Sequence, residues 1–248
     1  MTWVKICGTT NLEDALTAVE AGADAVGFVF YEKSPRNISV EAVREIVGKL
    51  PEGVEKIGVF VNDGELEPND VLLQAGLTGT QTYMVGQDNA RRGGGKEIGV
   101  SCLPKHPRFL MAVPMNLVGE DAEQIQHFAS DFARWGKNLP EEGASLLERL
   151  RDMFGYVLDS GDLRQPGGTG KTFDWEKAVP IAEGMRQGGV KLVVAGGLTP
   201  ENVGEAMKVL SPWGVDVVSG VEARPGKKDP EKVRAFVRAV REMDGKTG

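Results

Sequence analysis

The chain has 248 residues, of which 41% are hydrophobic and 26% charged, which is the composition of an ordinary globular protein. A formal net charge of -7 argues against nucleic acid or an anionic membrane as a partner, although local amides and cations could still hold a small anionic ligand. Two cysteines, Cys7 and Cys102, cannot build a disulfide framework, and the first residues predict a strand rather than a leader peptide. We therefore expect a cytoplasmic enzyme or binding protein, built as one α/β barrel or as two small domains.

Strand and helix patterns alternate along the first third of the chain. Apolar and β-branched runs predict strands at residues 3–8, 25–30, 55–62 and 80–85. Amphipathic spacing predicts helices at residues 11–21, 39–49 and 67–75. Asn11 and Ser39 are good N-cap residues for the first two of these helices. This alternation is typical of right-handed βαβ units that build a parallel sheet.

The pattern changes between residues 86 and 154. A strand is predicted at 109–113, whereas helical spacing at 122–135 and 144–153 gives one helix more than a simple unit needs. We interpret residues 86–154 as a divergent or inserted segment. His106 and His127 fall inside it without metal-ligand spacing, and Cys102 is interpreted as structural. The sequence therefore indicates no metal site.

The last third restores the alternation. Strands are predicted at residues 155–160, 190–195 and 215–219. Helices are predicted at residues 174–186, 200–210 and 230–243. Eight strand–helix units in about 250 residues match a (β/α)8 TIM barrel, here a single domain over residues 1–248. A doubly wound open sheet is the alternative.

Glycines follow the seventh and the eighth predicted strands, at Gly196, Gly197 and Gly220. Exposed amides at such strand-to-helix turns bind phosphate oxygens, and barrels commonly hold a phosphate between the loops after strands 7 and 8. Either loop alone could be a plain tight turn. Together they favour a phosphate site.

Cys7 ends the first strand, at the edge where α/β proteins place their chemistry. A lone cysteine is most often a small buried hydrophobe. Lys5 lies on the same face of the strand and would favour the thiolate. Because strand 8 neighbours strand 1 in a closed barrel, Asp216 could instead neutralise Lys5 in a structural pair. Both alternatives stay open at this point.

Asp159 ends the sixth strand, and Arg36 lies in the loop after the second. A phosphate held at strands 7 and 8 would have Asp159 on one flank and Cys7 on the other, which suggests proton shuttling in an isomerisation or epimerisation. A helix cap or a surface carboxylate is the alternative for Asp159. Arg36 offers a guanidinium fork to a carboxylate at the far end of a substrate, unless it is a solvated loop residue.

Together these segments resemble the phosphoribosylanthranilate isomerase family of tryptophan biosynthesis. The resemblance covers about residues 3–62 and 155–242. It rests on Lys5-Ile6-Cys7-Gly8, Gly27-Phe28-Val29-Phe30, Ser34-Pro35-Arg36, Gly58-Val59-Phe60-Val61-Asn62, Leu158-Asp159, Gly167-Gly168-Thr169-Gly170, Ala195-Gly196-Gly197-Leu198 and Ser219-Gly220-Val221-Glu222. It implies a (β/α)8 barrel that isomerises N-(5-phospho-ribosyl)anthranilate by a cofactor-free Amadori rearrangement.

The same resemblance implies a role for each candidate residue. Asp159 would be the general acid that opens the furanose ring, and Cys7 the general base that removes the C2′ proton. Arg36 would hold the anthranilate carboxylate. The other implied substrate-binding residues are Gly168, Gly196, Gly197, Asp216, Ser219 and Gly220. The implied partner is a small phosphosugar, and the chain is expected to be a monomer or a homodimer.

Strand 4 departs from the family pattern. The family usually has Gln-Leu-His-Gly there, whereas this chain has Gln81-Thr82-Tyr83-Met84. Two alternatives to the isomerase therefore stay open: a non-catalytic phosphosugar-binding barrel, and an aminosugar-phosphate isomerase of altered or dual specificity. The presence of Cys7, Asp159 and Arg36 together favours the isomerase.

Overall fold

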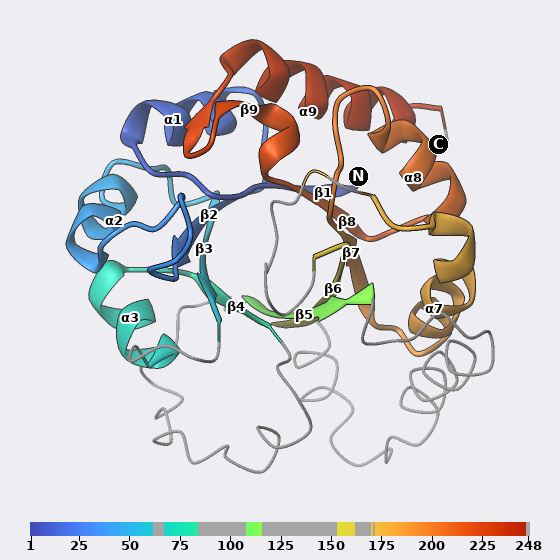
Figure 1. Ribbon diagram of the computed structural model, residues 1–248, viewed down its shortest axis with the longest axis horizontal. Coiled ribbons are helices and arrows are strands. Elements are labelled where there is room, and N and C mark those ends of the chain that lie inside the picture. Colours follow the sequence, from blue (N-terminus) through green and yellow to red (C-terminus); the bar gives the residue numbers. More distant parts are fainter. Residues whose placement is uncertain (62–66, 84–107, 116–152, 162–169, 171, 247–248) are drawn as a thin grey trace.

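Figure 1 shows the computed structural model, in which a ring of strands lies inside an outer layer of helices. The structure describes residues 1–61, 67–83, 108–115, 153–161, 170 and 172–246. The eight strands of the ring are β1 (Trp3–Ile6), β2 (Ala25–Phe30), β3 (Glu55–Phe60), β4 (Gly79–Tyr83), β5 (Arg108–Pro114), β6 (Phe154–Asp159), β7 (Lys191–Val194) and β8 (Gly214–Val217). Each strand begins within one residue of its predicted start.

The ring closes in sequence order, because β1 pairs in parallel with both β2 and β8. The register of the closing pair sets Lys5 opposite Asp216. The predicted (β/α)8 barrel is therefore confirmed, and the doubly wound open sheet is wrong. The divergent segment 86–154 lies outside the described residues, apart from β5 with its flanking residue Met115, and Met153 with the start of β6.

The helices of the outer layer are α1 (Leu12–Glu20), α2 (Val40–Val47), α3 (Pro68–Ala75), α7 (Trp175–Gln187), α8 (Val203–Leu210) and α9 (Pro230–Asp244). Both predicted N-caps are present: the side chain of Asn11 accepts the amide of Asp14 at 2.9 Å, and Ser39 accepts the amide of Ala42 at 3.2 Å. Within the described residues, no helix is both long and apolar enough to cross a bilayer.

The start of α8 differs from the prediction. The expected helix began at Pro200, but the observed one begins at Val203, and Pro200 lies in a turn. The side chain of Asn202 explains the difference, because it accepts the amide of Thr199 at 2.8 Å and donates to the carbonyl of Gly197 at 3.0 Å. These bonds stabilise a turn in place of the first helical residues, and they fix the loop after β7.

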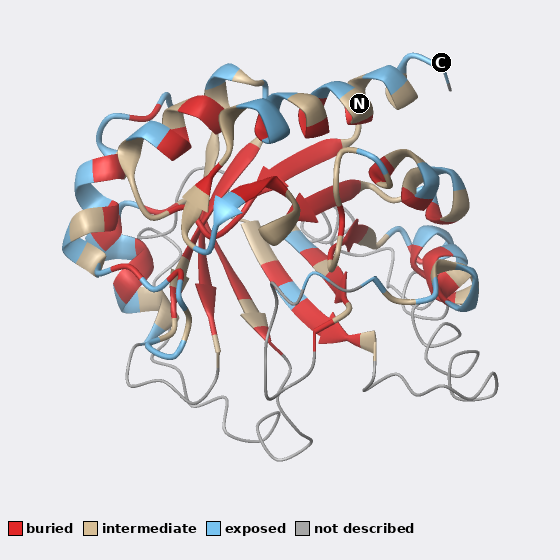
Figure 2. Cartoon of the chain, turned by 45° about the horizontal axis from the view of Figure 1, so that its top comes forward, coloured by how far each residue is buried: buried red, intermediate tan, exposed pale blue. Residues whose placement is uncertain are grey.

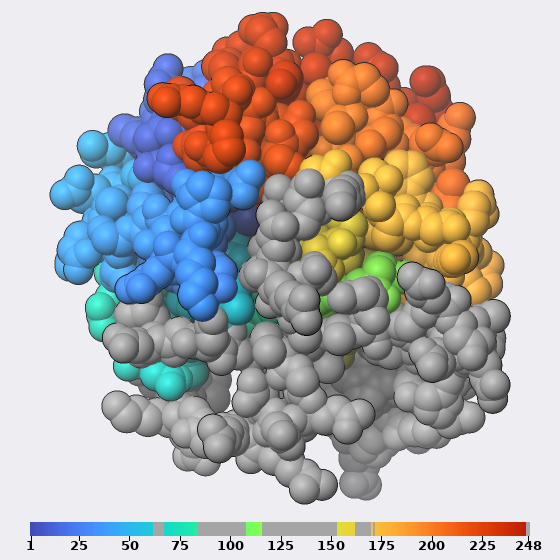
Figure 3. Space-filling view, viewed as in Figure 1, coloured from blue at the N-terminus to red at the C-terminus, as the bar shows by residue number. Residues whose placement is uncertain are grey.

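The end of β8 also differs from the prediction. The strand stops at Val217, and Ser219 begins a short 3-10 helix, η3 (Ser219–Val221). A hairpin of β9 (Glu222–Arg224) and β10 (Lys227–Lys228) follows. Figure 3 shows this part of the chain beside the N-terminal segment, where Lys227 pairs with Asp14 at 2.6 Å. The hairpin after β8 is therefore joined to α1 by this ion pair.

Strand alternation divides the core into two layers. Val4 and Ile6 face outward and pack with the helices, whereas Cys7 joins the inner cluster that fills the barrel. Figure 2 shows the buried strands at the centre and exposed residues on the outer faces of the helices. Because successive residues of β1 point to opposite layers, Lys5 and Cys7 both lie inside the barrel, as predicted.

A substitution at the start of β4 tests the packing between β4 and β5. A Cβ added at Gly79 would lie 2.2 Å from the carbonyl oxygen of Arg108, which is too close for the backbone to tolerate without a shift. We expect Gly79→Ala to lower the free energy of unfolding by about 1–3 kcal/mol in urea denaturation. Gly53 is exposed with open space around it, so Gly53→Ala should change stability by less than about 0.5 kcal/mol. Equal stabilities of the two variants would contradict this packing.

Candidate active site

The carboxyl ends of the strands border one cavity of about 650 Å³, including the part that is open to solvent. The cavity brings together most of the predicted site residues: Cys7, Arg36, Asp159, Gly196, Gly197, Asp216 and Ser219. Gly220 follows Ser219 in η3, and Gly168 lies outside the described residues. The structure therefore brings these residues to one edge of the barrel, and their roles stay a prediction.

Lys5 lies fully buried at the floor of the cavity. Its Nζ atom is 2.7 Å from Asp216 Oδ2 and 3.0 Å from Gln81 Oε1. Burial alone would lower the pKa of Lys5, but the charges of Asp216 and Cys7 and the hydrogen bond with Asp216 together raise it. The Lys5–Asp216 pair that the sequence left open is therefore present. Asp216 Oδ1 is buried and has no hydrogen-bond partner among the described residues.

Cys7 is buried at the end of β1, above Lys5. Gly27 on β2 leaves room for it, since a Cβ at Gly27 would lie 2.6 Å from the Cys7 sulfur. Burial raises the pKa of the Cys7 thiol, and the ammonium of Lys5 offsets only part of this rise. Lys5 therefore does both things that the sequence allowed. It forms the ion pair with Asp216, and its charge favours the Cys7 thiolate, although the pKa of Cys7 stays raised.

Asp159 ends β6 with both carboxylate oxygens bonded. The hydroxyl of Tyr83 donates to Oδ2 at 2.9 Å, and the amide of Gly161 donates to Oδ1 at 3.0 Å. Burial raises the pKa of Asp159, although the two hydrogen bonds work in the opposite direction. The surface-carboxylate alternative is therefore wrong, because Asp159 is only 4% exposed and lines the cavity. The helix-cap alternative concerns residues 162–169, which lie outside the described residues.

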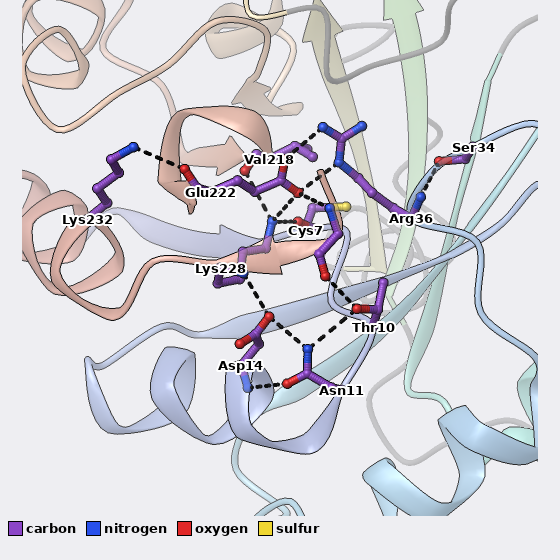
Figure 4. A network of polar contacts seen from close by, with 11 residues as sticks. Cys7, Thr10, Asn11, Asp14, Ser34, Arg36, Val218, Glu222, Lys228 and Lys232 are labelled. Carbon is purple, nitrogen blue, oxygen red and sulfur yellow. Dashed lines mark hydrogen bonds and ion pairs between the residues drawn. The ribbon is translucent and has the colours of Figure 1, made fainter. Parts of the chain in front are cut away.

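Arg36 reaches the cavity from the loop after β2 and is held by Glu222 (Figure 4). Its Nε is 2.9 Å from Glu222 Oε1, and its Nη2 is 2.8 Å from Oε2. The hydrogen bonds to Glu222 raise the pKa of Arg36. Arg36 is buried, so it is not the solvated loop residue of the alternative. Within the described part of the chain, Nη1 has no hydrogen-bond partner, which leaves one edge of the guanidinium for a ligand.

Lys228 supports this cluster from β10. Its Nζ atom donates to the carbonyl oxygens of Cys7 and Val218, and lies 3.3 Å from Glu222 Oε1 (Figure 4). Burial lowers the pKa of Lys228, and Glu222 opposes that shift. Sequence reasoning missed Lys228 and the pairing of Glu222 with Arg36, because the hairpin that carries Lys228 was not predicted. The same reasoning missed the contact between Tyr83 and Asp159.

The two glycine loops pack tightly against their neighbours. Gly196 and Gly197 have φ angles of +82° and +63°, which favour glycine. A Cβ at Gly196 would lie 2.5 Å from the amide nitrogen of Ser160, and one at Gly220 would lie 1.9 Å from the carbonyl oxygen of Leu198. The loops after β6, β7 and β8 are therefore in direct contact. In the described ranges, no group of three or more His, Cys, Asp or Glu residues could hold a metal ion.

Comparison with known proteins identifies the family. A family model for N-(5'phosphoribosyl)anthranilate (PRA) isomerase matches residues 4–78 and 119–239. An N-(5'-phosphoribosyl)anthranilate isomerase from Rubrobacter xylanophilus is 40% identical over 241 residues, which cover 97% of this chain and 100% of that protein. The corresponding enzyme from Pseudomonas fluorescens is 38% identical over 237 residues, which cover 96% and 97% of the two chains.

Solved structures give the same result. The phosphoribosyl anthranilate isomerase of Thermotoga maritima has a TM-score of 0.69 and 35% identity, with 98% of this chain and 100% of that chain covered. A phosphoribosyl anthranilate isomerase in complex with reduced 1-(o-carboxyphenylamino)-1-deoxyribulose 5-phosphate has a TM-score of 0.64, also at 35% identity and the same coverage. The chain therefore belongs to the N-(5'-phosphoribosyl)anthranilate isomerase family.

Proposed function

We propose that this protein isomerises N-(5-phospho-ribosyl)anthranilate to 1-(2-carboxyphenylamino)-1-deoxyribulose 5-phosphate in tryptophan biosynthesis. The observation that carries the proposal is the placement of a carboxyl and a thiol, Asp159 and Cys7, in one cavity of a chain that belongs to this family. They end β6 and β1, and the two glycine loops after β7 and β8 lie between them around the ring. An acid and a base on opposite sides of a bound phosphosugar are what an Amadori rearrangement requires.

The reaction begins with a proton from Asp159. Asp159 protonates the ring oxygen, the C1′–O4′ bond breaks, and the nitrogen lone pair forms a Schiff base at C1′. The Cys7 thiolate then removes the proton from C2′, and the electrons of that bond give a neutral enolamine. The enolamine takes a proton at C1′ and loses one from the C2′ hydroxyl, which yields the ketone. Cys7 acts as a base throughout, so no covalent intermediate forms on its sulfur.

The active form holds one proton on Asp159 and none on Cys7. Burial raises the pKa of both groups, and a carboxyl titrates below a thiol, so most singly protonated sites carry the proton on sulfur. The reactive form is then the minor tautomer. Activity should rise with pH through the pKa of Asp159, level off, and fall above the pKa of Cys7.

The remaining contacts fit the two anionic ends of this substrate. Amides around Gly196, Gly197, Ser219 and Gly220 would bind the phosphate, with Gly168 as a further contact. Nη1 of Arg36, which has no partner among the described residues, would bind the anthranilate carboxylate. Asp216 Oδ1, which has no partner in the described residues, would accept a hydrogen bond from a substrate hydroxyl.

One chain supplies all of these contacts that the structure describes, and the protein is expected to be a monomer or a homodimer. The cytoplasmic location stays a prediction from the sequence. Asp159 and Cys7 together argue against the non-catalytic barrel, which would need neither an acid nor a base.

Growth rescue tests the proposal as a whole. We expect the chain to restore growth on medium without tryptophan to cells that lack the isomerase. Purified protein should also convert the substrate in a direct assay. Failure of well-expressed, folded protein in both assays would favour the phosphosugar-binding barrel or the isomerase of altered specificity.

Two substitutions test the acid and the base. Cys7→Ser and Asp159→Asn should each lower kcat/KM by about 10²–10⁴-fold, since each removes one proton-transfer group. Asp70 is exposed on α3, so Asp70→Asn makes the same chemical change outside the cavity and should leave the rate unchanged. Full activity of either cavity variant would remove that residue from the mechanism, and a substrate adduct trapped on Cys7 would show it to be a nucleophile.

Asp159→Asn should also stabilise the fold at neutral pH. Burial raises the pKa of Asp159 in the folded state above its ordinary value of 3.8. The folded protein therefore loses stability as pH rises from 3.8 to the raised pKa, because the buried carboxyl must ionise. Asparagine carries no charge and can keep both contacts, accepting from Gly161 and donating to the Tyr83 oxygen. Urea unfolding should show a gain of about 1 kcal/mol at pH 7 that disappears below pH 4. A less stable variant at pH 7 would show that ionised Asp159 carries no burial cost.

A further inference from the structure

The departure at strand 4 places a hydroxyl group against the proposed acid. We propose that Tyr83 is a positioning residue for the isomerase reaction: it fixes the carboxyl group of Asp159 in the cavity and stabilises its ionised form. This inference rests on the proposed function for the role of Asp159. The contact itself does not, because it is a feature of the fold.

The geometry leaves Asp159 little freedom to rotate. Tyr83 Oη lies 2.9 Å from Oδ2, and the Gly161 amide nitrogen lies 3.0 Å from Oδ1, so each oxygen is held by a different donor. Tyr83 and Asp159 are 5% and 4% exposed, which leaves little access for water to compete with the bond. Tyr83 comes from β4 and Asp159 from β6, and side chains from alternate strands share a layer inside a barrel.

A phenol hydroxyl suits this position because it both donates and accepts. Burial and the charge of Asp159 raise the pKa of Tyr83 well above 10, so the hydroxyl keeps its proton in the working range. It donates to Oδ2 while Asp159 is ionised, and its oxygen can accept when Oδ2 carries the proton. The Gly161 amide can only donate. Tyr83 can thus keep its contact with Oδ2 in both protonation states of Asp159, while the Gly161 amide donates to Oδ1 in each of them.

The other charged groups around Asp159 come from two strands and would be unchanged in a Tyr83 variant. Among the described residues, Lys5 on β1 lowers the pKa of Asp159, and Asp216 on β8 raises it. Cys7, at the end of β1, acts on Tyr83 from the same cavity. Since the Tyr83 hydroxyl donates to the ionised carboxylate, its removal should raise the pKa of Asp159.

The test compares Tyr83→Phe with Tyr156→Phe. Tyr156 lies on β6 three residues before Asp159 and packs with the outer core, so its variant makes the same atomic change on the opposite face of the strand. The carboxyl carbon of Asp159 is titrated by ¹³C NMR, with Asp159→Asn used to assign the resonance. We expect Tyr83→Phe to raise the midpoint by about one pH unit, a tenfold change in proton affinity, and Tyr156→Phe to leave it in place.

The kinetic readout is the pH dependence of kcat/KM. In Tyr83→Phe the acidic limb should move upward by the same amount as the midpoint, while the alkaline limb, which reports Cys7, stays in place. The plateau value of kcat/KM is not used, because two opposing effects change it. The variant has a larger fraction of protonated Asp159, but the Asp159 carboxyl is less well oriented. Should Tyr83→Phe fail to fold, 3-fluorotyrosine at position 83 strengthens the same hydrogen bond and should lower the midpoint.

Each outcome separates this inference from the proposed function. An unchanged midpoint in Tyr83→Phe, or an equal shift in Tyr156→Phe, would overturn the role of Tyr83 while an active wild-type enzyme keeps the isomerase. The other outcome is that Tyr83→Phe shifts the midpoint while the wild-type protein has no isomerase activity. This would support the stabilising contact but overturn both the proposed function and the catalytic role of Tyr83.

Discussion

The buried ion pair between Lys5 and Asp216 is the interaction on which the rest of the site depends. It joins the first and last strands of the ring at the floor of the cavity, 2.7 Å from atom to atom. The pair cancels its own charge, so any further ionisation of Asp159 or Cys7 adds uncompensated negative charge to a buried space. Burial and this charge balance therefore favour a site in which Asp159 and Cys7 together hold one proton. The proposed reaction uses a site with one proton.

A second charged cluster balances the first at the rim. Glu222 lies between Arg36 and Lys228, and Lys228 also donates to the backbone carbonyl of Cys7. Two cations around one carboxylate leave this edge of the cavity favourable for anions, which suits a substrate with a phosphate and a carboxylate. The same contacts tie the end of β1 to the loop after β2 and to the hairpin after β8. One network therefore holds Cys7, the proposed base, and orients Arg36, in the manner of other preorganised sites.

Much of this arrangement could be predicted from the sequence, because strand order alone decides which loops meet. The alternation of Val4, Lys5 and Ile6 placed Lys5 inside the barrel, and ring closure placed it beside Asp216. The contacts of Tyr83 and Lys228 could not be predicted in the same way. Both depend on how far a long side chain reaches across the tilted barrel, and Lys228 also depends on a hairpin with no clear pattern. The start of α8 was mispredicted because the Asn202 side chain competes with the backbone for hydrogen bonds.

Strand β4 changes one wall of the site relative to the family pattern. Gln81, the residue that this strand shares with the family pattern, accepts from Lys5 and so supports the charge balance at the floor. Tyr83 stands where the family pattern usually has a histidine, one layer higher, and its hydroxyl donates to Asp159. A phenol makes this hydrogen bond without adding a group that titrates near neutral pH, as a histidine would. The hydrogen bond from Tyr83 to Asp159 therefore adds no further source of pH dependence to the cavity.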